Sequence, residues 1–133
     1  MPRPQLRLDA SSPSIIVPIT ARDLPGLEQS ARTLAGAGPA GSGALDAVEW
    51  RVDLYEPFAA GGGSDPAPAV TGLERLAAAL PDVPILATFR TTAEGGTAEI
   101  DPDSYVALIS ALSATGAAAA VDVEYRHPLA GPA

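Results

Sequence analysis

Short runs of apolar and β-branched residues alternate along this chain with segments whose apolar residues recur at helical spacing. Strands are expected at residues 14–19, 48–53, 85–89 and 119–125. The segment after the first strand carries one apolar stripe of helical spacing, formed by Leu24, Leu27, Ala31 and Leu34. A helix between successive strands acts as a right-handed crossover, which makes the strands parallel. The chain is therefore predicted to be an α/β protein whose parallel sheet is covered by helices on its outer face.

Local signals predict the limits of the two later helices. Thr71 with Glu74 three residues on has the pattern of a capping box, which predicts that a helix begins there. Asp101 is expected to cap the next helix, with Pro102 as its first residue and Gly116 just past its end. The apolar stripes are Leu73, Leu76, Ala77 and Leu80 in the first helix and Tyr105, Leu108, Ile109 and Leu112 in the second.

Two stretches are expected to be flexible connections. Residues 36–43 and 59–68 are rich in Gly, Pro, Ala and Ser. The glycine run at 61–63 is not followed by Lys-Ser or Lys-Thr, so it lacks the pattern of a phosphate-binding loop. The acidic segment 99–103 has the spacing of calcium ligands but no turn glycine and no closing glutamate, which favours helix capping over a metal site.

The strand expected at 48–53 alternates apolar and charged residues without a break. A period of two puts Glu49, Arg51 and Asp53 on one face and the apolar residues between them on the other. In an antiparallel sheet such a charged face would meet water. In a parallel sheet covered by helices, the charged face is expected to line a barrel interior or a cleft. Trp50 and Phe89 are expected on the outward face, packed beneath the helices.

Composition limits the possible partners. With 133 residues, 47% of them hydrophobic, and no second compositional block, a single domain spanning 1–133 is expected. A formal net charge of −8 disfavours nucleic acid and anionic membrane surfaces as partners. There is no cysteine for disulfide or thiolate chemistry, and residues 1–12 lack the apolar core of a signal peptide. A cytoplasmic location is therefore expected by default. No apolar run is long enough to predict a membrane span.

Three motifs follow one another on successive expected strands. They are Glu-Trp-Arg-Val-Asp at 49–53, Phe-Arg-Thr at 89–91 with Glu-Gly-Gly at 94–96, and Val-Asp-Val-Glu at 121–124. Together they closely resemble the N-terminal half of type I 3-dehydroquinate dehydratase. The resemblance implies an eight-stranded parallel barrel of the TIM type, with its site at the C-terminal ends of the strands. This chain would hold about the first four βα units, a half-barrel.

The resemblance also implies a mechanism and a set of roles. In that family a lysine forms a Schiff base with the ketone of 3-dehydroquinate, and a histidine removes a proton and assists loss of water. The product is 3-dehydroshikimate, in the shikimate pathway of aromatic amino-acid biosynthesis, and no cofactor or metal is needed. By position, Glu49, Arg51 and Arg90 would hold the substrate's polar groups, and Glu94 would orient the histidine. The supporting carboxylates would be Asp53, Asp122 and Glu124.

Two residues that this chemistry requires have no counterpart here. The sequence contains no lysine, and its eight cationic residues are all arginines, which stay protonated and cannot form an imine. The single histidine, His127, follows the fourth expected strand, whereas the family's histidine lies on a later one, so we expect His127 on a surface loop. The chain has four expected strands, whereas the family's barrel has eight, which indicates a truncated or split family member. The isolated chain is therefore predicted to be inactive.

Three interpretations of function stay open. In the first, the chain is half of a hydro-lyase, active when another chain supplies the C-terminal half or when these residues belong to a longer sequence. In the second, it is a non-catalytic half-barrel that binds a small polyhydroxylated acid or a protein partner. The third is an unrelated acidic α/β binding module. Because the expected inner face holds four carboxylates and two arginines, a lysine-bearing second half is favoured as a partner over a homo-oligomer of this chain.

Overall fold

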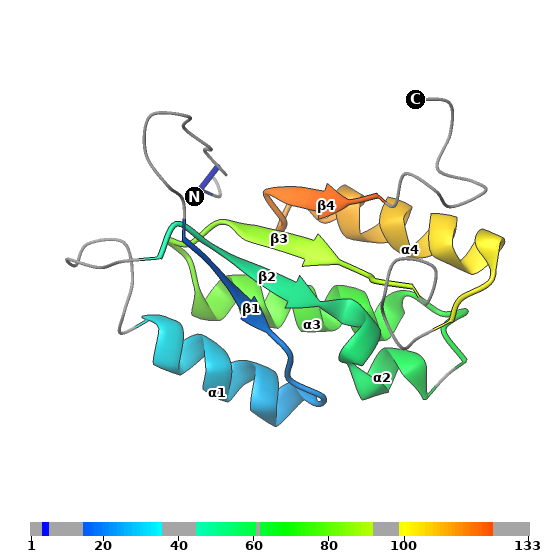
Figure 1. Ribbon diagram of the computed structural model, residues 1–133, viewed down its shortest axis with the longest axis horizontal. Coiled ribbons are helices and arrows are strands. Elements are labelled where there is room, and N and C mark those ends of the chain that lie inside the picture. Colours follow the sequence, from blue (N-terminus) through cyan, green and yellow to red (C-terminus); the bar gives the residue numbers. More distant parts are fainter. Residues whose placement is uncertain (1–3, 6–14, 36–44, 61, 92–98, 124–133) are drawn as a thin grey trace.

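The computed structural model describes residues 4–5, 15–35, 45–60, 62–91 and 99–123. Its elements in chain order are β1 (Ile16–Ile19), α1 (Leu24–Ala35), β2 (Ala47–Arg51), the 3₁₀ helix η1 (Val52–Leu54), α2 (Glu56–Ala59), α3 (Ala67–Ala79), β3 (Ile85–Thr88), α4 (Pro102–Ala114) and β4 (Ala120–Asp122). The four strands form one parallel sheet in the order β1-β2-β3-β4 (Figure 1). The α/β fold with a parallel sheet, predicted from the alternation of strands and helices, is confirmed.

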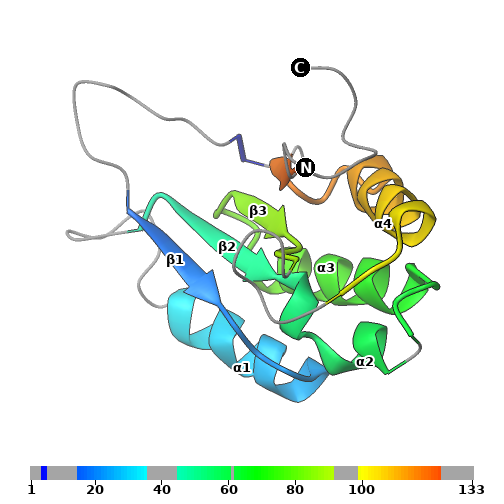
Figure 2. The same ribbon diagram turned by 45° about the vertical axis from the view of Figure 1, so that its right-hand side comes forward.

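The helices cover one face of this sheet. Figures 1 and 2 show α1 beneath β1 and α3 beneath the middle of the sheet, while α4 packs against α3 and β4. No described helix lies on the opposite side, which we call the open face. Because side chains alternate along a strand, every second residue of each strand points to the open face.

The hydrophobic core lies between the sheet and the helices. The helix residues buried there include Leu27, Ala31, Leu73, Leu76, Tyr105, Leu108 and Leu112. From the sheet, Val48, Trp50, Ile85 and Ala87 are fully buried against them. Each large apolar side chain removed from water in this way contributes about 1.5–3 kcal/mol to folding. The three apolar helix stripes predicted from the sequence are confirmed, and the core fixes which residues of β2 and β3 reach the open face.

Trp50 is the central side chain of this core. Its ring meets Tyr55 edge to face, with 5.4 Å between ring centroids. Gly72 of α3 makes the close approach possible, because a Cβ at that position would lie 3.0 Å from Cη2 of Trp50. Phe89 is also buried, and its ring lies 6.5 Å from that of Tyr105 of α4. The predicted packing of Trp50 and Phe89 beneath the helices is confirmed.

Strand β2 ends earlier than the alternation predicts. It stops at Arg51, and the next three residues form η1, so Asp53 lies outside the strand. The turn has a packing reason, since it brings Tyr55 and Phe58 into the core. It also lets the Glu56 backbone N–H donate to the carbonyl oxygen of Arg22, at 2.7 Å. The burial of these two side chains and this hydrogen bond outweigh the preference of the alternating residues for a strand that continues to Asp53.

The predicted capping box at Thr71 is wrong. Helix α3 begins four residues earlier, at Ala67, whose backbone N–H donates to Oδ1 of Asp65 at 3.0 Å. The early start buries Ala69 against the core. The segment 59–68, predicted to be a flexible connection, therefore holds the last residue of α2 and the first residues of α3. Between them the chain turns at Gly62 and Gly63, whose φ values are +81° and +75°.

The signals at the ends of α4 are confirmed. The Asp101 carboxylate accepts a hydrogen bond from the Ser104 backbone N–H at 3.0 Å, and Gly116 has a φ of +69°. The strand expected at 119–125 appears as β4, which is shorter because it begins at Ala120 and ends at Asp122, before Val123; residues 124–125 lie outside the described residues. The expected connection at 36–43 also lies outside them, as do Glu94, Glu124 and His127. Within the described ranges, no helix has the length and apolar character needed to cross a membrane.

Candidate active site

Polar side chains gather at the carboxyl ends of β2 and β3. Arg51 of β2 is paired in register with Thr88 of β3, and Glu49 lies two residues before Arg51 on the same face. Asp53 and Arg90 each lie two residues beyond the end of their strand, β2 and β3, and these two strands run side by side (Figure 1). Both residues therefore lie near the same end of the sheet. We call Glu49, Arg51, Asp53, Thr88 and Arg90 the carboxyl-end cluster. In parallel α/β folds this end of the sheet is where ligands bind.

Asp53 is the buried anchor of the cluster. Its side chain has no solvent exposure, and its two oxygens accept hydrogen bonds from Nε and Nη2 of Arg51 at 2.9 and 2.7 Å. Oδ1 also accepts from the backbone N–H of Arg90, at 3.1 Å. The forked pairing suits the planar guanidinium group. One carboxylate therefore fixes the Arg51 side chain and joins the end of β2 to the end of β3.

The pairing changes the acid–base character of Arg51. The hydrogen bond to Asp53 raises the pKa of Arg51 above its usual value, even though partial burial acts in the opposite direction. The negative charges of Asp53 and Glu49 raise this pKa further. Arg51 therefore remains cationic and cannot serve as a general base. Its role is confined to donating hydrogen bonds and supplying positive charge.

Glu49 is held more loosely than Asp53. Its Oε2 accepts a hydrogen bond from the Thr88 hydroxyl at 2.9 Å. The same oxygen lies 3.9 Å from Nη2 of Arg90, which is beyond hydrogen-bond distance. The side chains of Glu49 and Arg90 keep 23% and 37% of their exposure. The pair therefore leaves an acceptor and a donor that solvent or a ligand can reach.

The cluster offers balanced charge and complementary hydrogen-bonding groups. Glu49 and Asp53 face Arg51 and Arg90, and Asp53 is already occupied by Arg51. The accessible groups are then one carboxylate and one guanidinium, an arrangement suited to hydroxyl groups, which both donate and accept. Among the described residues, no group of three or more potential metal-ligating side chains is present. The geometry favours recognition of a polar organic ligand.

The remaining predicted site residues are placed less fully. Asp122 of β4 is paired in register with Thr88, so it borders the cluster on the open face. Its side chain is half-buried and has no hydrogen bond or ion pair with the described part of the chain. Glu94 and Glu124 lie outside the described residues. Thr88 is not among the site residues predicted from the sequence, although a polar residue within the apolar run 85–89 is a signal that could have identified it.

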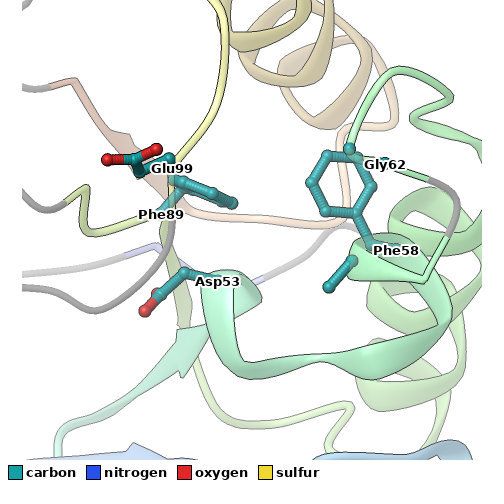
Figure 3. A pocket seen from close by; sticks show the side chains of 7 residues that line it. Asp53, Phe58, Gly62, Phe89 and Glu99 are labelled. Atoms are coloured by element: carbon teal, nitrogen blue, oxygen red, sulfur yellow. The ribbon is translucent and has the colours of Figure 1, made fainter.

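A cavity of about 320 Å³ adjoins the cluster at Asp53. It is lined by Asp53, Phe58, Ala59, Gly62, Gly63, Phe89 and Glu99. Figure 3 shows Phe58 on one side and Phe89 on the other, with the carboxylates of Asp53 and Glu99 on the Phe89 side. The two rings meet edge to face, with 6.1 Å between their centroids. Both Asp53 oxygens are engaged by Arg51 and Arg90, so this residue has little acceptor capacity left for a ligand in the cavity.

Comparison with known proteins identifies the family. The sequence model for type I 3-dehydroquinase matches residues 15–130. The chain belongs to the type I 3-dehydroquinase family. Curated 3-dehydroquinate dehydratases from Listeria welshimeri and Syntrophotalea carbinolica are each 36% identical to it, over 85% and 86% of this chain. The resemblance predicted from the three motifs is confirmed.

Solved structures of the family have the same fold. The type I 3-dehydroquinate dehydratase from Clostridium difficile, solved with covalent modified comenic acid, is 33% identical with a TM-score of 0.73 over 85% of this chain. The 3-dehydroquinate dehydratase from Enterococcus faecalis is 28% identical with a TM-score of 0.77 over 97% of this chain. These matches cover 40% and 50% of those chains, and this chain spans about 40% of the length of the first curated relative. The expected barrel-type α/β fold, present here in part, is confirmed.

Proposed function

We propose that the carboxyl-end cluster is the part of a 3-dehydroquinate dehydratase site that holds the substrate's hydroxyl groups. The observation that carries this proposal is the gap between Glu49 and Arg90. Their charged atoms are 3.9 Å apart and partly exposed. A hydroxyl group between them could donate to the carboxylate and accept from the guanidinium. The family membership supports 3-dehydroquinate as the ligand, because the curated relatives are 3-dehydroquinate dehydratases.

The balanced charge of the cluster also indicates which side of the substrate it receives. A substrate carboxylate needs surplus positive charge, and here Arg51 is neutralised by Asp53 through two hydrogen bonds. Only Arg90 remains, and it faces Glu49. The cluster is therefore suited to the hydroxyl-bearing side of the ring, and the substrate carboxylate is expected to be bound by cationic groups elsewhere in a complete site.

We further propose that these 133 residues bind the substrate but do not convert it. Schiff-base formation requires a lysine amine, and the sequence has none. Turnover is then expected only when a lysine and a general base are supplied from outside these residues. The alternative function, binding of a small polyhydroxylated acid without chemistry, rests on the same cluster and the same missing lysine.

Substrate binding by this chain is tested by titrating the purified chain with 3-dehydroquinate in a calorimeter. Arg90→Ala is expected to weaken binding by about 1–3 kcal/mol, roughly 5- to 150-fold, because Glu49 and the ligand lose their cationic partner. The matched control is Arg75→Ala, which removes an exposed arginine of α3 whose ion pair with Glu28 spans 3.9 Å. Equal affinities for the two variants would contradict the assignment.

The expected absence of substrate conversion is tested by borohydride reduction in the presence of 3-dehydroquinate. We expect no covalent adduct on any side chain by mass spectrometry, and no formation of the conjugated enone product by ultraviolet absorbance. A trapped side-chain adduct would refute the proposed requirement for a lysine from outside these residues.

The expected association is tested by sedimentation across protein concentration. Among the described residues, β1 and β4 each lack a partner strand on one edge, and Ile15 and Ile16 are exposed. Unpaired edges and exposed apolar residues favour association with further chains. Mixing with a lysine-bearing C-terminal half of a family member is expected to give a tighter complex than self-association. A compact monomer at all concentrations, with or without the complement, would contradict this expectation.

A further inference from the structure

Thr88 combines burial with a polar contact at the centre of the carboxyl-end cluster. Only 1% of its surface is exposed, although it lies on the open face of β3. Its register partners are Arg51 on one side and Asp122 on the other. A buried hydroxyl costs free energy unless it finds a hydrogen-bond partner. Thr88 finds this partner in Oε2 of Glu49, at 2.9 Å.

This hydrogen bond decides where the Glu49 carboxylate can lie. Glutamate has three side-chain torsions, so a carboxylate 3.9 Å from a guanidinium is free to rotate into direct contact unless something else holds it. The Thr88 hydroxyl donates to the same oxygen that faces Arg90. Threonine is β-branched and stiff at χ1, so its hydroxyl is a rigid anchor for this oxygen.

We propose that Thr88 is a positioning residue that holds Glu49 away from Arg90 and so keeps the gap between them open for a ligand hydroxyl. The identity of the ligand in this proposal rests on the proposed function, whereas the geometry of Thr88, Glu49 and Arg90 does not. Without the Thr88 hydroxyl, Glu49 is expected to close onto Arg90 as a direct ion pair. A ligand would then have to break that pair before binding, and its affinity would fall.

The test compares Thr88→Val, which keeps the β-branched shape and removes the hydroxyl, with Thr88→Ser, which keeps the hydroxyl. Loss of one hydrogen bond that orders an acceptor is expected to weaken 3-dehydroquinate binding about three- to tenfold in Thr88→Val. Thr88→Ser is expected to bind within about twofold of the unaltered chain. Equal weakening in both variants, or none in Thr88→Val, would overturn the proposal.

A second readout needs no ligand. The guanidinium ¹⁵N–¹H resonances of Arg90 in the free chain report whether it has a direct carboxylate partner. Those of Arg51, which is paired bidentately with Asp53, are an internal reference for a bound guanidinium. In Thr88→Val, the Arg90 resonances are expected to shift toward the Arg51 pattern, and in Thr88→Ser to stay in place. Unchanged Arg90 resonances in Thr88→Val would overturn the proposal.

The two readouts separate the possible failures. If the unaltered chain does not bind 3-dehydroquinate, the proposed function fails, while the Arg90 resonances still decide the role of Thr88. If Thr88→Val prevents folding, Thr88→Ala removes the same hydroxyl with less bulk, and the same two outcomes apply to it. If the Arg90 resonances of Thr88→Ala show that Glu49 and Arg90 stay apart, the positioning role of Thr88 is refuted.

Discussion

Replacing Asp53 with alanine is expected to destabilise the fold more than removal of any exposed carboxylate. The change deletes both acceptors of Arg51 and the acceptor of the Arg90 backbone N–H. Removing one partner of a buried ion pair typically lowers the unfolding free energy by about 3–5 kcal/mol, because the remaining charge is left without a partner. Here the Arg51 side chain retains 21% exposure, so water can compensate part of the loss. The structure therefore favours the lower end of that range.

The expected loss for Asp53→Ala is about 3 kcal/mol of unfolding free energy, of which about 1 kcal/mol is the lost acceptor of the Arg90 N–H. For a chain of this length the loss corresponds to a decrease of roughly 10 °C in the unfolding midpoint. Asp53→Asn keeps an oxygen that can accept from Arg90 or from one Arg51 donor, so its loss is expected to be about half as large.

The assay is denaturant unfolding at one fixed protein concentration, because association would shift the midpoint. Fluorescence of Trp50, the single tryptophan and a fully buried residue, reports core exposure. Hydrogen exchange at the Arg90 amide reports the strand-joining bond directly. Asp82→Ala is the matched control, since Asp82 is exposed and has no hydrogen bond or ion pair with the described residues. Equal midpoints for Asp53→Ala and Asp82→Ala would refute the reasoning.

Two further perturbations test the core and the cap of α4. Gly72→Ala is expected to lower the unfolding free energy by about 1 kcal/mol, because overpacking against Trp50 and Tyr55 outweighs the gain in helix propensity; a stabilised variant in urea unfolding would contradict this. Hydrogen bonds from the Ser104 hydroxyl and backbone N–H lower the pKa of Asp101 from its usual 3.8. Because the folded-state pKa is lowered, the ionised carboxylate stabilises the fold above pH 3.8, and this contribution is lost as the pH falls through the lowered value. The stability difference between the unaltered chain and Asp101→Asn should therefore shrink between pH 6 and acid pH, and a constant difference would argue against the cap's ionic contribution.

The sequence alone determined the features that repeat along the chain or depend on near neighbours. Strand and helix periodicity predicted the four parallel strands and the apolar helix faces, because burial on one side leaves a regular pattern. The cap at Asp101 and the turn at Gly116 were predictable because each depends on residues a few positions away. The charged face of Glu49 and Arg51 followed from the same alternation.

Only the tertiary structure decided where elements stop and which polar groups meet. β2 ends at Arg51 and α3 begins at Ala67 because burial of distant residues outweighs local pattern. The Thr88–Glu49 bond joins residues 39 positions apart, and the bond from Arg90 to Asp53 joins residues 37 apart. Such contacts depend on the register of β2 against β3, which the packing of the whole sheet on its helices fixes. The open gap between Glu49 and Arg90 exists for the same reason, since no local pattern encodes a distance between two strands.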